Sequence, residues 1–143
     1  RLPLQTARAA RSGPLLAPEG MEQGDMNELF VQALQVVGDM HASGVDILVG
    51  TDHHALPGVA LHTELELLSE AGISNADVIE LATGNAARIM GLDQDYGSIT
   101  PGKYADLLLL RDNPVTDIAA TRSIELVVRQ GVVYSAEQFD AAR

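Results

Sequence analysis

Hydrophobic residues ahead of residue 45 recur at steps of three and four, the pattern of an amphipathic helix. The apolar stripe consists of Met26, Leu29, Phe30, Ala33, Leu34 and Val37, and ends on His41. Asp25 and Glu28 have the spacing of a capping box at the start of this helix, with Asp in place of Ser or Thr. Gly44 is placed to end the helix, and Gly38 is expected to weaken it by about 1 kcal/mol relative to Ala.

Residues 45–50 (VDILVG) form a short, nearly continuous apolar run. This pattern predicts a strand that is buried on both faces in a parallel sheet, rather than one with a solvated side. The run ends abruptly at Thr51-Asp52-His53-His54. We therefore expect Asp52 to stand at the carboxyl end of a buried strand.

Two further helical patterns follow this strand. Leu61, Leu65 and Leu68 form a stripe that Gly72 closes. Ser74 and Asp77 have capping-box spacing and open a helix that ends at Gly91. Within it, Gly84-Asn85 predicts a kink or a break into two helices.

The pattern changes to short strands after residue 96. A Pro101-Gly102 turn leads into the apolar run 107–110, and two β-branched runs around Gln130-Gly131 predict a hairpin. Asn113-Pro114 marks a loop between them. The chain is thus expected to divide into a connector or loop (1–24), a segment of helices and one parallel strand (25–95), and a β segment with a tail (96–143).

Composition narrows the classes of function. Of 143 residues, 46% are hydrophobic and only 3% aromatic, so the core must be aliphatic. Nine basic against twenty acidic residues give a net charge of −11, which excludes nucleic acid and anionic membranes as partners. The absence of cysteine excludes disulfides and thiolate metal sites. No apolar run approaches the roughly 18 residues of a membrane span, and no signal peptide is evident, so a soluble protein is expected, cytoplasmic rather than secreted.

Asp52 is the first candidate for chemistry. In α/β folds with parallel strands, the carboxyl ends of the strands face the active site. A carboxylate there needs a partner that offsets its desolvation, such as a metal ion, an arginine or backbone amides. The alternative is that Asp52 only caps the turn after the strand.

Histidines near Asp52 are the next candidates. In an extended segment Asp52 and His54 would share a face, and His62 begins the following helix at the mouth of the same loop. Together they would form a local metal site, although no His-Glu-x-x-His spacing supports it. Contact with substrate, or simple exposure, is the alternative for both histidines. His41 is interpreted as a structural residue that complements the helix dipole.

The acidic pairs in the sequence have a simpler interpretation. Glu64 with Glu66 falls on a predicted helix, and Asp93 with Asp95 falls in a predicted loop. Both pairs are expected to belong to solvated faces.

Four sequence pieces occur in a recognisable order: GVDILVGTD, HTELELLSEAGIS, VIELATGNAARIMGL and GSITPGKYADLLLL, the last followed by DNP. From about Met26 to Tyr134 this order resembles the C-terminal portion of the amidohydrolase superfamily, metal-dependent hydrolases with a (β/α)8 barrel and a flanking β-sandwich. Two stretches, His62-x-Glu64-Leu65-Glu66-Leu67 and Asn113-Pro114, look most like the imidazolonepropionase and Xaa-Pro dipeptidase branch.

The resemblance implies an α/β fold class, with the C-terminal part of a (β/α)8 barrel and part of the sandwich. It implies that Asp52 contacts a divalent metal, most simply zinc, takes the proton from the attacking water and passes it to the leaving nitrogen. His54 and His62 would lie over the pocket and touch substrate. The family's other metal ligands, a His-x-His pair, two further histidines and often a carboxylated lysine, have no counterpart here. A complete barrel also needs roughly 250 residues.

Two functions of different classes follow from these observations. The first is the C-terminal part of a metal-dependent amidohydrolase that hydrolyses a non-peptide C–N bond of a cyclic amide, or a dipeptide-type amide. Its partners would be the small-molecule amide and the N-terminal part of the barrel, and the chain alone would be inactive. The alternative is a non-catalytic module that forms homo-oligomers through the strand edges at 45–50 and 107–110.

Overall fold

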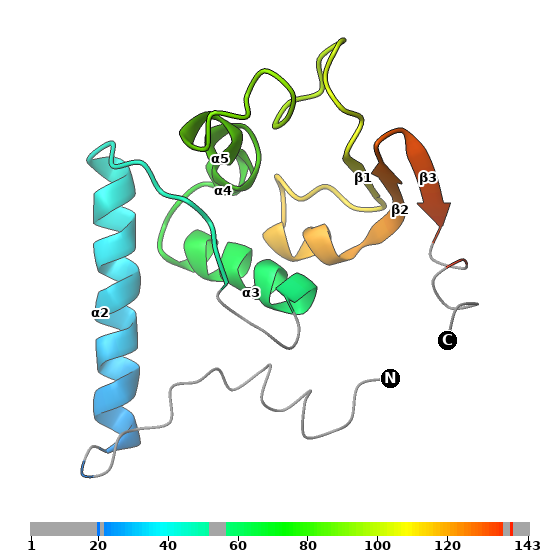
Figure 1. The fold of residues 1–143 in the computed structure, drawn as a ribbon. Coiled ribbons are helices and arrows are strands. Elements are labelled where there is room, and N and C mark those ends of the chain that lie inside the picture. The colour runs from blue at the N-terminus through cyan, green and yellow to red at the C-terminus, as the bar shows by residue number, and fades with distance from the viewer. Residues whose placement is uncertain (1–19, 21, 52–56, 136–137, 139–143) are drawn as a thin grey trace.

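The computed structural model describes residues 20, 22–51, 57–135 and 138, in which helices precede a small sheet. Figure 1 shows the long helix α2 beside α3, with the sheet on the opposite side of the molecule. The helices are α2 (Gln23–Ala42), α3 (Pro57–Glu70), α4 (Asn75–Ala82), α5 (Gly84–Ile89) and the 3-10 helix η1 (Ile118–Arg122). The strands are β1 (Leu107–Leu110), β2 (Ile124–Arg129) and β3 (Val132–Ser135).

Helix α2 covers the predicted stripe, but it begins earlier than the sequence indicates. Its N-cap is Glu22, which makes no side-chain capping bond, and Asp25 lies within the first turn. The predicted capping box at Asp25 is therefore wrong, although a carboxylate there still complements the helix dipole. The predicted end is confirmed: Gly44 has φ +79° and its N–H donates to the carbonyl of His41 at 2.9 Å. No described helix is both long and apolar enough to cross a membrane.

The predicted strand at residues 45–50 does not form a strand in the described structure. The segment is extended, with Ile47 and Val49 packed against the core, whereas Val45 and Leu48 are 44% and 51% exposed. Burial on both faces was therefore the wrong prediction. A strand needs a neighbour at hydrogen-bonding distance, and the described sheet contains only β1, β2 and β3.

The helices after this segment follow their sequence signals. Ser74 caps α4, since its Oγ accepts a hydrogen bond from the Asp77 N–H at 3.2 Å. Thr83 separates α4 from α5, which confirms the predicted break next to Gly84. Gly91 ends α5 with φ +69°, so the predicted helix end is also confirmed.

An aliphatic core joins the helices to the β segment. Its buried members are Leu65, Leu68, Ile73, Val78, Leu81 and Ile118. Ile118 comes from η1, more than thirty residues after the last of the others, so η1 packs the β segment onto the helical part of the chain. The absence of aromatic residues from this core agrees with the composition.

The sheet is antiparallel with the order β1-β2-β3. Gln130 and Gly131 both have positive φ, 50° and 80°, which matches the right-handed twist of the strands they join and confirms the predicted hairpin. Leu108 and Leu109 point to opposite faces because side chains alternate along a strand, and they are 55% and 50% exposed. Both faces of the sheet therefore carry exposed apolar surface.

Gly38 lies where α2 crosses the turn after α3, and replacing it with Ala is expected to destabilise the fold. A Cβ on Gly38 would lie 2.2 Å from the Ala71 carbonyl oxygen. Overpacking of this kind costs about 1–3 kcal/mol, more than the roughly 1 kcal/mol that Ala would contribute to an isolated helix. Urea unfolding measures the difference in the free energy of unfolding between Gly38→Ala and the wild type. Gly24→Ala in the same helix meets nothing within 4 Å and is the control; equal behaviour of the two variants would contradict the prediction.

Candidate functional site

The three predicted site residues are divided between described and undescribed parts of the chain. Asp52 and His54 lie outside the described residues. His62 lies in the second turn of α3 and is partly buried. The structure therefore describes the surroundings of His62 and of the segment that leads to Asp52.

His62 is tied to η1 by a hydrogen bond across 59 residues of sequence. Its Nδ1 lies 3.0 Å from Oγ1 of Thr121, whose hydroxyl also lies 2.9 Å from the carbonyl oxygen of Ile118. Burial lowers the pKa of His62 below 6.5, and the positive charge of Arg122 lowers it further, while Glu66 acts in the opposite direction. The surroundings thus favour the neutral imidazole.

Arg122 forms a second link between η1 and α3. Its Nε and Nη2 donate to the two carboxylate oxygens of Glu66 at 2.7 and 3.1 Å, and Nη2 also donates to Thr63 at 3.1 Å. The interpretation of Glu66 as part of a solvated face is therefore wrong, because its carboxylate is held by a bidentate ion pair. Both side chains keep about a third of their surface exposed, so the pair contributes orientation and no more than about 1 kcal/mol.

Asn85 anchors the extended segment that precedes Asp52. Its buried side chain donates from Nδ2 to the Ile47 carbonyl at 3.1 Å and accepts from Arg88. Arg88 in turn lies 3.6 Å from Asp46. The sequence had indicated only a helix break at this position, whereas the buried amide of Asn85 also bonds to the backbone of the segment at Ile47.

The described residues do not fit a metal site. No group of three or more His, Cys, Asp or Glu side chains comes together among them. His41 lies 4.0 Å from Asp77, and Glu66 is engaged by Arg122, so these candidates have protein partners. The local site of Asp52, His54 and His62 remains a prediction, because two of its members are not described.

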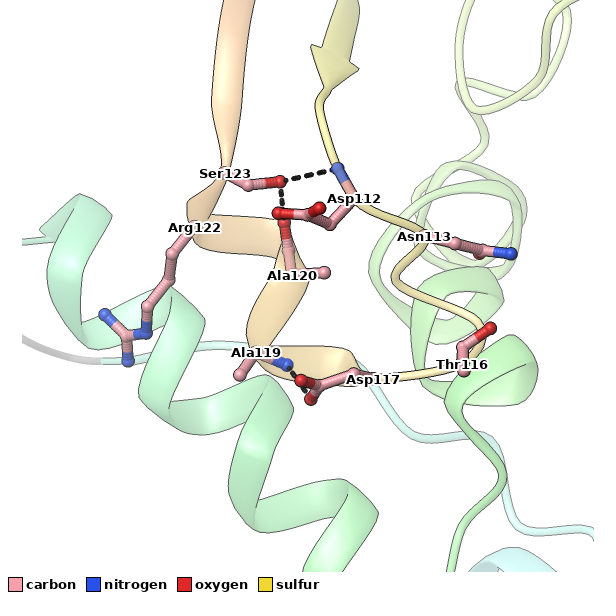
Figure 2. Close-up of a pocket in the computed structure, with 8 residues that line it drawn as sticks. All are labelled: Asp112, Asn113, Thr116, Asp117, Ala119, Ala120, Arg122 and Ser123. Carbon is pink, nitrogen blue, oxygen red and sulfur yellow. Dashed lines mark hydrogen bonds between the residues drawn. The ribbon is translucent and has the colours of Figure 1, made fainter.

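A hollow of about 640 Å³ lies between η1 and the loop that precedes it. Figure 2 shows Arg122 extending from η1 away from Asp112, Asn113 and Thr116. Two of the polar side chains in this hollow bond to the local backbone: Asp117 accepts from the Ala119 N–H at 3.0 Å, and Ser123 accepts from the Asp112 N–H at 3.1 Å. These two side chains therefore stabilise turns, while Arg122 is engaged by Glu66 on α3.

Comparison with known proteins assigns the fold to a family. Residues 25–134 match the Amidohydrolase family, which is most of the chain. The chain belongs to the amidohydrolase family. A Xaa-Pro dipeptidase with bound methionine has a TM-score of 0.68 at 28% identity, covering 73% of this chain and 26% of that one. The predicted fold class is therefore confirmed: this amidohydrolase chain has the α/β fold of part of the family's barrel, with part of the flanking sandwich.

Two other relatives show how far the likeness extends. A putative prolidase from Bifidobacterium longum is 38% identical with a TM-score of 0.65, covering 71% of this chain and 26% of that one. An adenine deaminase from Clostridium botulinum (strain Loch Maree / Type A3) is 31% identical over 121 residues, 80% of this chain and 19% of the relative. The amidohydrolase chain thus spans about a fifth to a quarter of the length of these proteins.

Glu64, two residues from His62, provides a test of the electrostatics of α3. Burial raises the pKa of Glu64 above 4.5, so the ionised form is disfavoured in the folded amidohydrolase chain. The protonated carboxyl of Glu64 is compatible with burial at acid pH. As the pH rises through the folded pKa of Glu64, the carboxyl ionises and the free energy of unfolding falls. Glu64→Gln is therefore expected to increase the free energy of unfolding at neutral pH, with a smaller gain near pH 4, in urea titrations.

Glu70→Gln is the matched control for this prediction. Glu70 is exposed at the end of the same helix, so its replacement removes a charge without relieving burial. An equal gain in both variants would attribute the effect to net charge, which is −11 for the chain, and would contradict the burial argument.

Proposed function

We propose that this chain is the C-terminal part of a metal-dependent hydrolase acting on the C–N bond of a cyclic amide or a dipeptide-type amide. The observation that carries the proposal is the anchored segment 45–51. Ile47 and Val49 pack on the core and Asn85 binds the Ile47 carbonyl, so the segment holds a fixed course to the residue before Asp52. A catalytic carboxylate needs this kind of rigid support.

Asp52 is the proposed general base and one ligand of a divalent metal, with zinc as the simplest choice. A carboxylate is ionised at neutral pH and would accept a proton from water and deliver it to the leaving nitrogen. A catalytic zinc usually has three protein ligands, so the others would come from other strands of a complete barrel. His54 and His62 are proposed to contact the substrate.

The relatives support C–N bond hydrolysis but differ in substrate. The adenine deaminase and the Xaa-Pro dipeptidase are named for an exocyclic amine and a dipeptide amide, respectively. The putative prolidase combines 38% identity with a TM-score of 0.65. We therefore place dipeptide-type amides first among the substrates.

A chimera tests the proposal directly. The chain would replace the corresponding quarter of the Bifidobacterium longum putative prolidase, and release of proline from Xaa-Pro dipeptides and of ammonia from adenine would be measured. We expect proline release by the chimera, and neither bound zinc nor turnover from the 143-residue chain alone. Turnover with stoichiometric zinc in the isolated chain, or a folded, zinc-loaded but inactive chimera, would overturn the proposal.

Self-association is the second candidate function, and exposed apolar side chains favour it. Val31 and Val36 of α2 are 64% and 55% exposed, and Leu108 of the sheet is 55% exposed. Surfaces of this kind mark association sites. Discrete oligomers of the isolated chain in light scattering would support a non-catalytic module. Polydisperse aggregates would instead indicate apolar surface that is normally covered by the rest of a barrel.

A further inference from the structure

The hydroxyl of Thr121 lies between a backbone carbonyl of η1 and the ring of His62. A threonine hydroxyl has one hydrogen to donate and oxygen lone pairs that accept. Oγ1 of Thr121 lies within hydrogen-bond distance of both the Ile118 carbonyl, 2.9 Å, and His62 Nδ1, 3.0 Å. A carbonyl can only accept, so both bonds form together only if the hydroxyl donates to Ile118 and accepts from an Nδ1–H of His62.

The opposite arrangement would leave one of these bonds unmade. If the hydroxyl donated to Nδ1, it could not also donate to the Ile118 carbonyl. Thr121 is buried, with 8% of its surface exposed, so water does not readily replace the lost bond. The network therefore favours His62 with its proton on Nδ1.

A neutral imidazole with its proton on Nδ1 has a lone pair on Nε2. The ring is kept neutral by burial and by Arg122 of η1, against the opposing charge of Glu66 on α3. Among the described residues, every fully buried side-chain nitrogen or oxygen has a hydrogen-bond partner. The hydrogen bond of His62 is made through Nδ1, so its Nε2 is not fully buried. Nε2 is therefore able to accept a hydrogen bond from a ligand.

We infer that Thr121 is a positioning residue that holds His62 as the Nδ1–H tautomer, so that Nε2 accepts a hydrogen bond from an N–H group of the substrate. This inference rests on the proposed function for the substrate class. It assigns His62 the role of an acceptor, for which a dipeptide offers the N–H groups of its terminal amine, since an amide nitrogen that belongs to proline carries no hydrogen. It also gives η1 a role at the site through Thr121, which does not itself touch the substrate.

Histidine tautomers are read by NMR of the 15N-labelled ring nitrogens in the full 143-residue chain. The His62 signals are assigned with His62→Gln. We expect a protonated Nδ1 and a bare Nε2 in the wild type and in Thr121→Ser, which keeps the hydroxyl. In Thr121→Val, which has nearly the same shape but no acceptor, we expect the proton to move to Nε2. Two results would overturn the inference. One is a proton on Nε2 of His62 in the wild type; the other is the same tautomer in Thr121→Val as in a folded Thr121→Ser.

Ligand binding is tested in the folded chimera, which supplies the rest of the site, with benzamide and N,N-dimethylbenzamide, which differ in the presence of an N–H donor. We expect benzamide to move the Nε2 resonance of His62 and the dimethyl compound to leave it in place. No shift with benzamide, or equal shifts with both, would overturn the acceptor role. These NMR measurements do not depend on turnover. An inactive chimera would therefore overturn the proposed function, whereas the tautomer of His62 would still be decided by the NMR spectra.

Discussion

Replacing Asp52 with Asn in the active chimera is expected to lower kcat for amide hydrolysis by about 10²–10⁴-fold, the usual effect of removing a general base. The amide of Asn is close in shape to the carboxylate but does not accept a proton from water at neutral pH. Steady-state kinetics with a Xaa-Pro dipeptide measure the loss, and metal analysis of the same sample shows whether the bound zinc is retained.

Asp46→Asn is the matched control for Asp52→Asn. Asp46 lies in the same extended segment, is exposed, and has Arg88 at 3.6 Å as its partner. Its replacement removes an equal charge without touching the proposed base, so kcat is expected to stay near the wild-type value. A loss below tenfold in Asp52→Asn, or equal losses in the two variants, would refute the role of Asp52.

Replacing Gly97 with Ala is expected to destabilise the fold by about 2–5 kcal/mol, from strain and overpacking together. Gly97 has φ +85°, a conformation that costs other residues about 1–2 kcal/mol. Its added Cβ would also lie 2.5 Å from the Ala87 Cβ and 3.0 Å from the Thr83 carbonyl oxygen. Because Ala87 is buried and Thr83 contributes a backbone atom, neither neighbour moves aside easily. The midpoint and slope of urea unfolding give the change in the free energy of unfolding.

Gly102→Ala separates strain from crowding in this prediction. Gly102 has a similar φ, +97°, but a Cβ there meets nothing within 4 Å. We therefore expect Gly102→Ala to cost only the conformational strain, about 1–2 kcal/mol. Equal losses in the two variants would show that the contact of Gly97 with α5 does not contribute.

Local signals in the sequence predicted most of the helices and the hairpin correctly. Ser74 caps α4, Gly91 ends α5, and Gln130-Gly131 forms the tight turn between β2 and β3. Each of these features depends on residues a few positions apart, so its energetics are contained in a short stretch of sequence. The error at Asp25 was of the same local kind, because a capping spacing occurred inside a helix that began two residues earlier.

Predictions that depended on contacts between residues far apart in the sequence were less accurate. The run 45–50 has the composition of a buried strand, yet one face is exposed because no described strand lies beside it. Glu66 looked like a solvated residue, but Arg122 reaches it across 56 residues. Helix propensity alone favours Ala at position 38, whereas the Ala71 carbonyl leaves room only for Gly.

The sequence by itself determined the family, most of the helices, the hairpin and the position of Asp52 after an apolar run. Only the tertiary structure decided that Thr121 and Arg122 meet His62 and Glu66, and that Asn85 anchors Ile47. The physical reason is separation: these pairs are 38 to 59 residues apart. Neither periodicity nor spacing encodes such contacts. The two that involve Thr121 and Arg122 exist only once η1 has packed Ile118 into the core.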